Sequence, residues 1–210
     1  MTHTRRWTST TAAATAALLT VTLAACASSP AEEEAAPAEQ SAPPAAEETV
    51  SAAVHNDADT QFAQMMIVHH EGAVEMAELA IERADSAEVR ALAERIAGAQ
   101  GPEIETMTSW LGAWDEELPG EMDMGGMDHG GMEMDGMDQE TAMAELSGLS
   151  GSDFDRRFLE LMTAHHRGAI EMADEHRGEG ENPEALRLSG VIIDAQTLEI
   201  TEMTNLLLAL

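Results

Sequence analysis

The chain of 210 residues contains one cysteine, no lysine and no tyrosine, and only 3% of its residues are aromatic. Cys26 ends an N-terminal apolar segment, so the rest of the chain offers no disulfide, thiolate ligand or cysteine nucleophile. Any bound metal must therefore be held by histidine, methionine, carboxylate or backbone groups. The sequence also lacks strand signals, serine triads, phosphate loops and zinc-binding cysteine patterns, which excludes the common enzyme classes built on them.

Positive charge is scarce as well. Ten arginines face 40 acidic residues, which gives a formal net charge of −30. Such a chain is repelled by nucleic acid and by anionic lipid surfaces, and it attracts cations and basic surfaces. We therefore expect no nucleic-acid partner, although a solubilising acidic surface explains part of the charge.

The first 25 residues have the features of an export signal. Arg5 and Arg6 precede an apolar stretch, residues 12–25, that is too short to span a membrane comfortably. The sequence Leu-Ala-Ala-Cys at 23–26 resembles the lipobox of bacterial lipoproteins, in which the cysteine becomes the lipidated first residue. The alternative is a chance cysteine after an ordinary signal peptide. We expect a lipoprotein anchored at Cys26 on the extracytoplasmic side of the cell envelope, with only the lipid entering the membrane.

Composition divides the remaining chain into a tether and a domain. Residues 26–56 are rich in alanine, proline and glutamate, and such a segment buries too little apolar surface to fold. Residues 57–210 contain an internal repeat with a constant offset of 96 residues. The recurring residues include Asp59, Phe62, Met66, His69, His70, Gly72, Glu75 and Met76, which return as Asp155, Phe158, Met162, His165, His166, Gly168, Glu171 and Met172.

Each repeat predicts two helices, because apolar residues recur at spacings of three and four. Capping signals support this: Asp85 to Glu88 can open the second helix, Ser152 with Asp155 the third, and Asn182-Pro183 the fourth. We therefore predict an all-α four-helix bundle made of two hairpins, residues 57–117 and 151–210. Gly101-Pro102 interrupts the second helix, where we expect a bend.

A long loop, residues 118–150, separates the repeats and contains a methionine-rich segment. Methionine usually fills cores, but no other large apolar residue accompanies these methionines, and glycine and acids surround them. Thioether sulfur is a soft donor that suits Cu(I) and Ag(I). The alternatives are a sacrificial oxidation loop or low-complexity drift. The candidate ligands of this loop are Met122, Met124, Met127, His129, Met132, Met134 and Met137.

Paired histidines on the apolar stripes of the first and third helices form the second candidate site. Imidazole and thioether groups both bind late transition metals, and adjacent buried histidines are costly without partners. The methionines could equally be core residues. The candidate ligands here are Met66, His69, His70, Met76, Met162, His165, His166 and Met172.

Polar residues also enter the apolar stripes of the second and fourth helices, followed by Met107 and Met203. The carboxylates could bind metal, or accept a ring N–H and orient a histidine. They could instead form a hydrogen-bond network that sets the register of the bundle. These residues are Gln100, Glu103, Gln196 and Glu199. His176, which follows Met172 by one turn, and His55 in the tether are weaker ligand candidates.

Two sequence boxes carry a family resemblance over roughly residues 57–210. The His-His-x-Gly-Ala-x-Glu-Met-Ala box and the Gln-x-x-Glu-Ile-x-x-Met box each occur twice. They resemble the bacterial family catalogued as domain of unknown function three hundred and five, which includes CopM-type envelope copper-binding proteins. The resemblance implies a ferritin-like bundle, a role in copper or silver tolerance, and metal sites built from histidine and methionine. It adds Met107 and Met203 to the candidate metal ligands. The Gly101-Pro102 break departs from that pattern in the first of the Gln/Glu/Met boxes.

Three functions remain open from the sequence. The first is a protein that sequesters Cu(I) or Cu(II), and silver, or passes the metal to a copper exporter or another envelope copper protein. The second is a ferritin-like di-iron or copper oxidase. No glutamate is followed three residues later by histidine, as di-iron bundles require, which argues against the di-iron version and leaves a copper oxidase open. The third is a structural or interaction bundle with buried histidines, which leaves the methionine-rich loop unexplained. We expect binding without catalysis.

Overall fold

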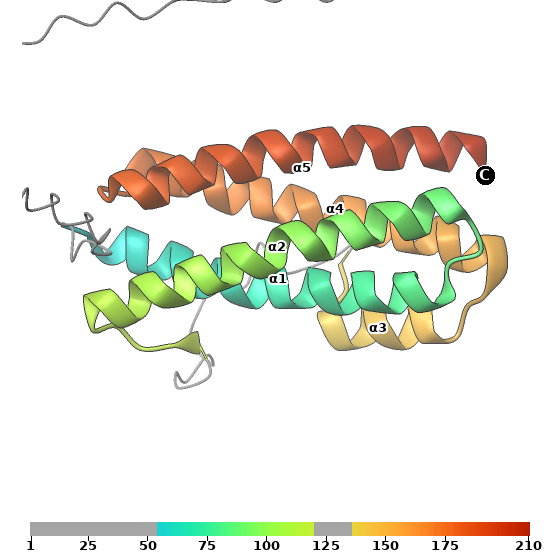
Figure 1. The fold of residues 1–210 in the computed structure, drawn as a ribbon, viewed down its shortest axis with the longest axis horizontal. Coiled ribbons are helices and arrows are strands. Elements are labelled where there is room, and N and C mark those ends of the chain that lie inside the picture. Colours follow the sequence, from blue (N-terminus) through green and yellow to red (C-terminus); the bar gives the residue numbers. More distant parts are fainter. Residues whose placement is uncertain (1–53, 120–135) are drawn as a thin grey trace, which may run out of the picture. The chain divides into compact units, whose positions relative to one another are not determined.

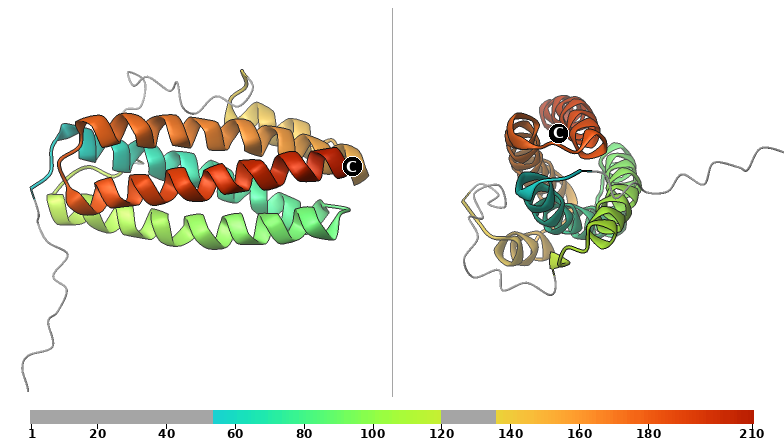
Figure 2. Two further views of the ribbon diagram at one scale, coloured as in Figure 1. Left: turned by 90° about the horizontal axis from the view of Figure 1, so that it is seen from above. Right: turned by 90° about the vertical axis from the view of Figure 1, so that its left-hand side faces the viewer.

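The computed structural model describes residues 54–119 and 136–210, and these residues form five helices. Four of them are long: α1 (Asp57–Arg83), α2 (Ala87–Trp114), α4 (Gly151–Glu179) and α5 (Pro183–Ala209). Helix α1 packs along α2, α4 packs along α5, and α1 and α4 bring the two pairs together. Viewed end on, the four helices surround a common core (Figure 1 and Figure 2). The expected helical bundle is confirmed.

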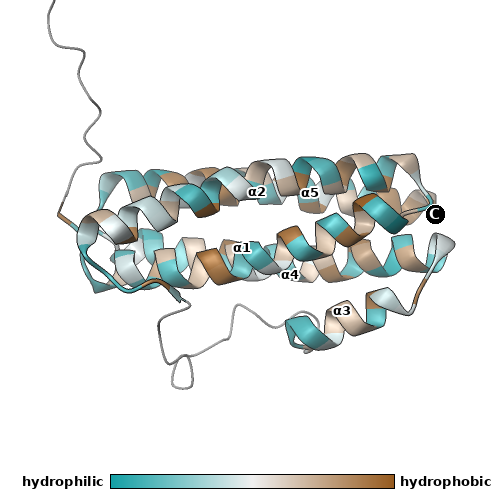
Figure 3. Cartoon of the chain, turned by 60° about the horizontal axis from the view of Figure 1, so that its bottom comes forward, coloured by the Kyte–Doolittle hydropathy of each residue, from teal (hydrophilic) through white to brown (hydrophobic). Residues whose placement is uncertain are grey.

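One short helix, α3 (Gln139–Ser147), was not expected, because the sequence predicted a loop over residues 118–150. Asp138 caps its start by accepting the N–H of Thr141 at 2.8 Å. Helix α3 packs outside the bundle against α1 and α4, burying Ala142 and Leu146 (Figure 3). With only two buried apolar anchors in nine residues, this helix leaves little periodicity to detect in the sequence.

The helix starts follow local hydrogen bonding. Asn182 caps α5 and Pro183 occupies the first turn, as the sequence predicted. Ser86 caps α2, which then continues through Pro102 to Trp114. The predicted cap of the third long helix, Ser152 with Asp155, is wrong. Helix α4 begins at Gly151 after Ser150, and no side chain caps it.

Asp155 does not cap its own helix and instead binds the backbone of the opposite hairpin. Its carboxylate accepts the backbone N–H groups of Asp85 and Ser86, at 3.0 and 2.7 Å, in the turn between α1 and α2. At the opposite end of the bundle, Asp59 accepts the N–H groups of Glu181 and Asn182 in the turn between α4 and α5, each at 3.1 Å. The first helix of each hairpin therefore holds the turn of the other hairpin.

Two apolar clusters fill the bundle, one toward each end. The first contains Phe154 and Phe158 of α4 with Leu92 and Ile96 of α2. The second contains Phe62 of α1 with tryptophans and aliphatic residues of α2 and α5. Hydrophobic and hydrophilic segments alternate along the long helices (Figure 3). None of the helices in the described ranges is both long and apolar enough to cross a membrane.

Candidate metal centre

A layer of polar side chains separates the two apolar clusters at the middle of the bundle. On every long helix the residues before this layer belong to one cluster and those after it to the other. All of its histidine and glutamine side chains are buried, and the glutamates are partly buried. We call this set the polar layer: His69, His70, Gln100, Glu103, His165, His166, Gln196 and Glu199.

Two histidines of the polar layer meet across the interface between α1 and α4. The ring centroids of His69 and His165 lie 3.6 Å apart, with a 48° angle between the ring planes. The ring of His70 lies 6.5 Å from that of His69. The first histidine of each pair therefore faces the other hairpin, at the centre of the bundle.

The second histidine of each pair faces the other helix of its own hairpin. His70 Nε2 lies 2.7 Å from a carboxylate oxygen of Glu103, and His166 Nε2 lies 2.7 Å from one of Glu199. A carboxylate can only accept, so Nε2 carries the proton and donates it to this bond. In the neutral ring the lone pair is then on Nδ1. This arrangement resembles the carboxylate–histidine pairs that orient metal ligands.

Charge is disfavoured at the centre of the polar layer. Burial lowers the pKa of His165 well below its ordinary value of 6.5, and repulsion from the three neighbouring histidines lowers it further. His165 is therefore neutral at neutral pH. A neutral imidazole can bind a metal ion without first releasing a proton.

Several buried atoms of the polar layer have no hydrogen-bond partner within the described residues. They are Nδ1 of His70, His165 and His166, and the side-chain oxygens of Gln100 and Gln196. Each such atom left unsatisfied costs about 1–3 kcal/mol, so native proteins rarely retain several together. The donor set consists of imidazole nitrogens and amide oxygens, which fits a borderline metal ion such as Cu(II).

The predicted methionine ligands of the bundle lie within the two apolar clusters or pack against them. Met66 and Met107 belong to one cluster, Met76, Met162 and Met203 to the other, and all five are fully buried, whereas Met172 is partly buried. Met66 and Met162 precede the histidine pairs by one helical turn, which puts them beside the polar layer. The sulfur of Met203 accepts the hydroxyl of Thr163 at 3.6 Å.

The remaining predicted ligands lie mostly outside the described residues. Of the loop, only Met137 is described, and it packs against the core. Among the described residues, no three histidine, cysteine or acidic side chains form a ready ligand group, so methionine or amide donors would have to complete a site. The predicted site residues that lie outside the described residues are Cys26, Met122, Met124, Met127, His129, Met132 and Met134.

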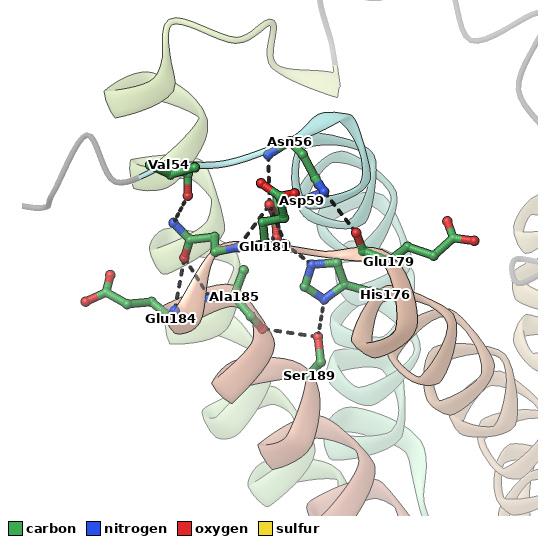
Figure 4. Close-up of polar contacts among 10 residues, drawn as sticks. Val54, Asn56, Asp59, His176, Glu179, Glu181, Glu184, Ala185 and Ser189 are labelled. Carbon is green, nitrogen blue, oxygen red and sulfur yellow. Dashed lines mark hydrogen bonds and ion pairs between the residues drawn. The ribbon is translucent and has the colours of Figure 1, made fainter.

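His176 is not placed as a ligand. Its Nε2 lies 2.8 Å from Asp59 Oδ1 and its Nδ1 lies 2.6 Å from Ser189 Oγ (Figure 4). Its ring stacks on Phe62. All three polar side chains are buried. We call Asp59, His176 and Ser189 the end network. His55, the other weak candidate, stacks on Trp114 and lies 3.3 Å from a carboxylate oxygen of Glu116.

Sequence reasoning missed one residue next to the polar layer. Gln139, the first residue of α3, reaches Gly72 on α1, and the space in front of Gly72 also contains Nε2 of His165. Because 67 residues separate Gln139 from Gly72, only the folded arrangement reveals this contact.

Comparison with known proteins gives a consistent family assignment. The family model described as domain of unknown function (DUF305) matches residues 59–207. A DUF305 protein from Streptomyces coelicolor that is thought to be secreted is 37% identical, covering 72% of this chain and 91% of that one, with a TM-score of 0.64. A DUF305 fragment from Deinococcus radiodurans is 33% identical, covering 75% and 100%, with a TM-score of 0.66. No curated protein matches the sequence.

A third similar structure is CopM in its Cu(II)-bound form. It is 34% identical, covering 72% of this chain and 96% of that one, with a TM-score of 0.61. CopM has also been solved with Cu(I) and with silver bound. Because the family model spans well over half of the sequence, this chain belongs to the DUF305 family, whose solved relatives include a protein that binds copper.

Proposed function

We propose that this protein binds copper outside the cytoplasm, as Cu(I) or Cu(II), and that silver can replace Cu(I). The polar layer holds the ion through histidine nitrogens, and the neighbouring methionines supply sulfur. The methionine-rich loop captures Cu(I). The biological role is sequestration, tolerance or transfer to another envelope copper protein, without catalytic turnover.

The observation that carries the proposal is the set of unpartnered donor atoms in the polar layer. A bundle that needed only stability would fill this level with apolar side chains, because buried polar groups without partners are destabilising. Here three imidazole nitrogens and two amide oxygens without partners among the described residues lie within one layer of the core. The similarity to CopM with bound copper supports copper as the ion.

Hydrogen bonding behind the histidines supports metal binding rather than general packing. Glu103 and Glu199 accept from Nε2 of the second histidine of each pair, and this fixes each ring with Nδ1 available. Copper fits this donor set, since imidazole suits both oxidation states and thioether suits Cu(I).

The proposed location is the extracytoplasmic side of a membrane of the cell envelope, with a lipid on Cys26 as the anchor. The lipobox sequence and the similarity to a protein thought to be secreted support this. Replacing the anchor residue (Cys26→Ser) is expected to release the protein from membranes into the soluble fraction. If the serine variant stays in detergent-washed membranes, the lipid anchor is wrong.

Copper titration against a competing chelator tests the function. We expect the purified mature protein to bind Cu(I) and Cu(II), and a variant with leucine at six loop methionines to bind fewer Cu(I) ions with unchanged helicity. Leucine keeps the apolar bulk and removes the sulfur. If wild-type protein binds no copper in competition, the proposed function fails, and unchanged Cu(I) stoichiometry in the variant removes the loop as a site. The substituted positions are Met122, Met124, Met127, Met132, Met134 and Met137.

A further inference from the structure

Helix α3 brings a polar side chain to the edge of the polar layer from outside the four long helices. The helix is held to α4 by Arg157, which donates to both carboxylate oxygens of Glu145 at 3.0 and 3.1 Å. On its inner side Ala142 and Leu146 enter the core. The first residue of α3, Gln139, is thereby fixed against α1.

Hydrogen bonds determine how the Gln139 amide is oriented. Its nitrogen donates to the backbone oxygen of Gly72 at 3.0 Å and to a carboxylate oxygen of Glu75 at 2.9 Å. Both partners can only accept, so the amide cannot be turned around. The amide oxygen is buried and has no partner within the described residues.

The amide oxygen and a histidine nitrogen share the space in front of Gly72. A Cβ atom at position 72 would lie 2.9 Å from Gln139 Oε1 and 3.4 Å from His165 Nε2. The glycine at position 72 therefore leaves room for both atoms. Any larger residue at position 72 would displace the Gln139 side chain from this space.

We propose that the side-chain oxygen of Gln139 is an additional metal ligand, which completes the polar layer on the side of His165. The proposal rests on the copper-binding function above and adds a third amide oxygen to the imidazole nitrogens and amide oxygens of the polar layer. Cu(II) accepts nitrogen and oxygen ligands, whereas Cu(I) and Ag(I) favour sulfur. Gln139 therefore favours the oxidised ion.

Two substitutions separate a ligand from an anchor of α3. Gln139→Leu removes the oxygen and the N–H donor, whereas Gln139→Glu keeps an oxygen but loses the donor and places a second carboxylate beside Glu75. If Gln139 is a metal ligand, Gln139→Leu should weaken Cu(II) binding by about tenfold or more and change the Cu(II) electron paramagnetic resonance spectrum. Gln139→Glu then keeps Cu(II) affinity close to that of wild type, and Ag(I) affinity is unchanged in both variants.

The remaining outcomes contradict the proposal. Equal weakening of Cu(II) binding in both variants, or equal weakening of Cu(II) and Ag(I), means that Gln139 only anchors α3. No effect of Gln139→Leu means that the oxygen is not a ligand. The unfolding temperature of each metal-free variant is measured in parallel, because a fold defect would lower it. If wild-type protein binds no copper at all, the copper-binding function fails, which is a distinct result.

Discussion

The bundle buries histidines in two places, and the two groups differ in how their polar atoms are used. In the end network His176 has a partner at each ring nitrogen, and the hydroxyl of Ser189 also donates to the backbone oxygen of Ala185 at 3.1 Å. In the polar layer, Nδ1 of three histidines and two amide oxygens have no partner within the described residues. Burial is nearly the same in both places, so burial alone does not identify a metal site.

The difference teaches how to read a buried histidine in this fold. The end network closes on itself and joins the start of α1 to the end of α4 and to α5, which is a structural task (Figure 4). The polar layer contains buried nitrogen and oxygen atoms without hydrogen-bond partners among the described residues, and such atoms are available to bind a metal ion. We infer that the first stabilises the bundle and that the second serves its function.

The end network has no counterpart in the first hairpin. In the first hairpin the positions equivalent to His176 and Ser189 are Ala80 and Ala93, both fully buried. The turn residue beside the network is Gly180, where a Cβ atom would collide with His176 and Asp59. The first hairpin has Ala84 at this position and tolerates it, since no histidine is present there.

The largest effect on stability is expected from Asp59→Ala. This change removes the partner of His176 and the acceptor of three backbone N–H groups, those of Asn56, Glu181 and Asn182. We expect the free energy of unfolding, measured in urea, to fall by about 3 kcal/mol or more, because buried polar groups lose their partner. Copper affinity of the folded protein should not change. A loss of copper binding without loss of stability would break the distinction between the two regions.

Asp155→Ala is the matched control, and its effect should be smaller. The carboxylate of Asp155 holds two backbone N–H groups of the opposite turn and has no histidine partner among the described residues. We expect a decrease of about 1–2 kcal/mol in the free energy of unfolding. An effect as large as that of Asp59→Ala would show that His176 adds nothing to the end network.

Acid should affect the polar layer first. The pKa of His165 is lowered in the fold from its ordinary value of 6.5, so the unfolded chain takes up a proton that the folded protein does not. The stability from the neutral ring is therefore present above pH 6.5 and is lost as the pH falls below it, by at most about 1.4 kcal/mol per pH unit. Metal-free wild type should lose unfolding free energy from pH 6.5 to 5, and His165→Gln should lose less. Identical slopes would contradict a neutral, buried His165.

The carboxylate of Asp59 in the end network should respond in stronger acid. Burial works to raise the pKa of Asp59, but hydrogen bonds from His176 and three backbone N–H groups outweigh it and lower the pKa below the ordinary 3.8. Stability from this carboxylate is present above about pH 3.8 and is lost as the pH falls through the lowered pKa. Asp59→Asn should flatten the dependence of unfolding free energy on pH below 3.8. If Asp59→Asn already flattens the pH dependence of the unfolding free energy near pH 6, the acid response there comes from the end network and not from the polar layer.

Sequence periodicity predicted much of the bundle and of the polar layer. Spacings of three and four define the long helices, and the constant offset placed both histidine pairs and both glutamates at equivalent points. The contacts of His70 with Glu103 and of His166 with Glu199 then follow from the pairing of neighbouring helices. Local patterns suffice here because each contact joins two adjacent helices.

Contacts between distant segments were not predictable in this way. Asp59 reads as a residue of the first turn of α1, yet its main partner His176 lies 117 residues away. Asp155 was expected to cap its own helix and instead holds the opposite turn. Gln139 follows a methionine-rich segment with no helical pattern, and its role depends on the gap left by Gly72. Such contacts arise from tertiary packing, which a single sequence does not encode locally.

The most direct test of the copper site combines His69→Gln and His165→Gln in protein whose six loop methionines are leucine. Glutamine has a similar size and can hydrogen-bond, but it is a poor copper ligand. In the background without the histidine changes, copper should raise the unfolding temperature, since a ligand bound only to the folded state at 100 times its dissociation constant adds about 2.7 kcal/mol. We predict that the double variant melts nearly as before without copper and gains nothing when copper is added. A large loss of metal-free stability with the copper-induced gain intact would show that these histidines are structural and that the polar layer is not the metal centre.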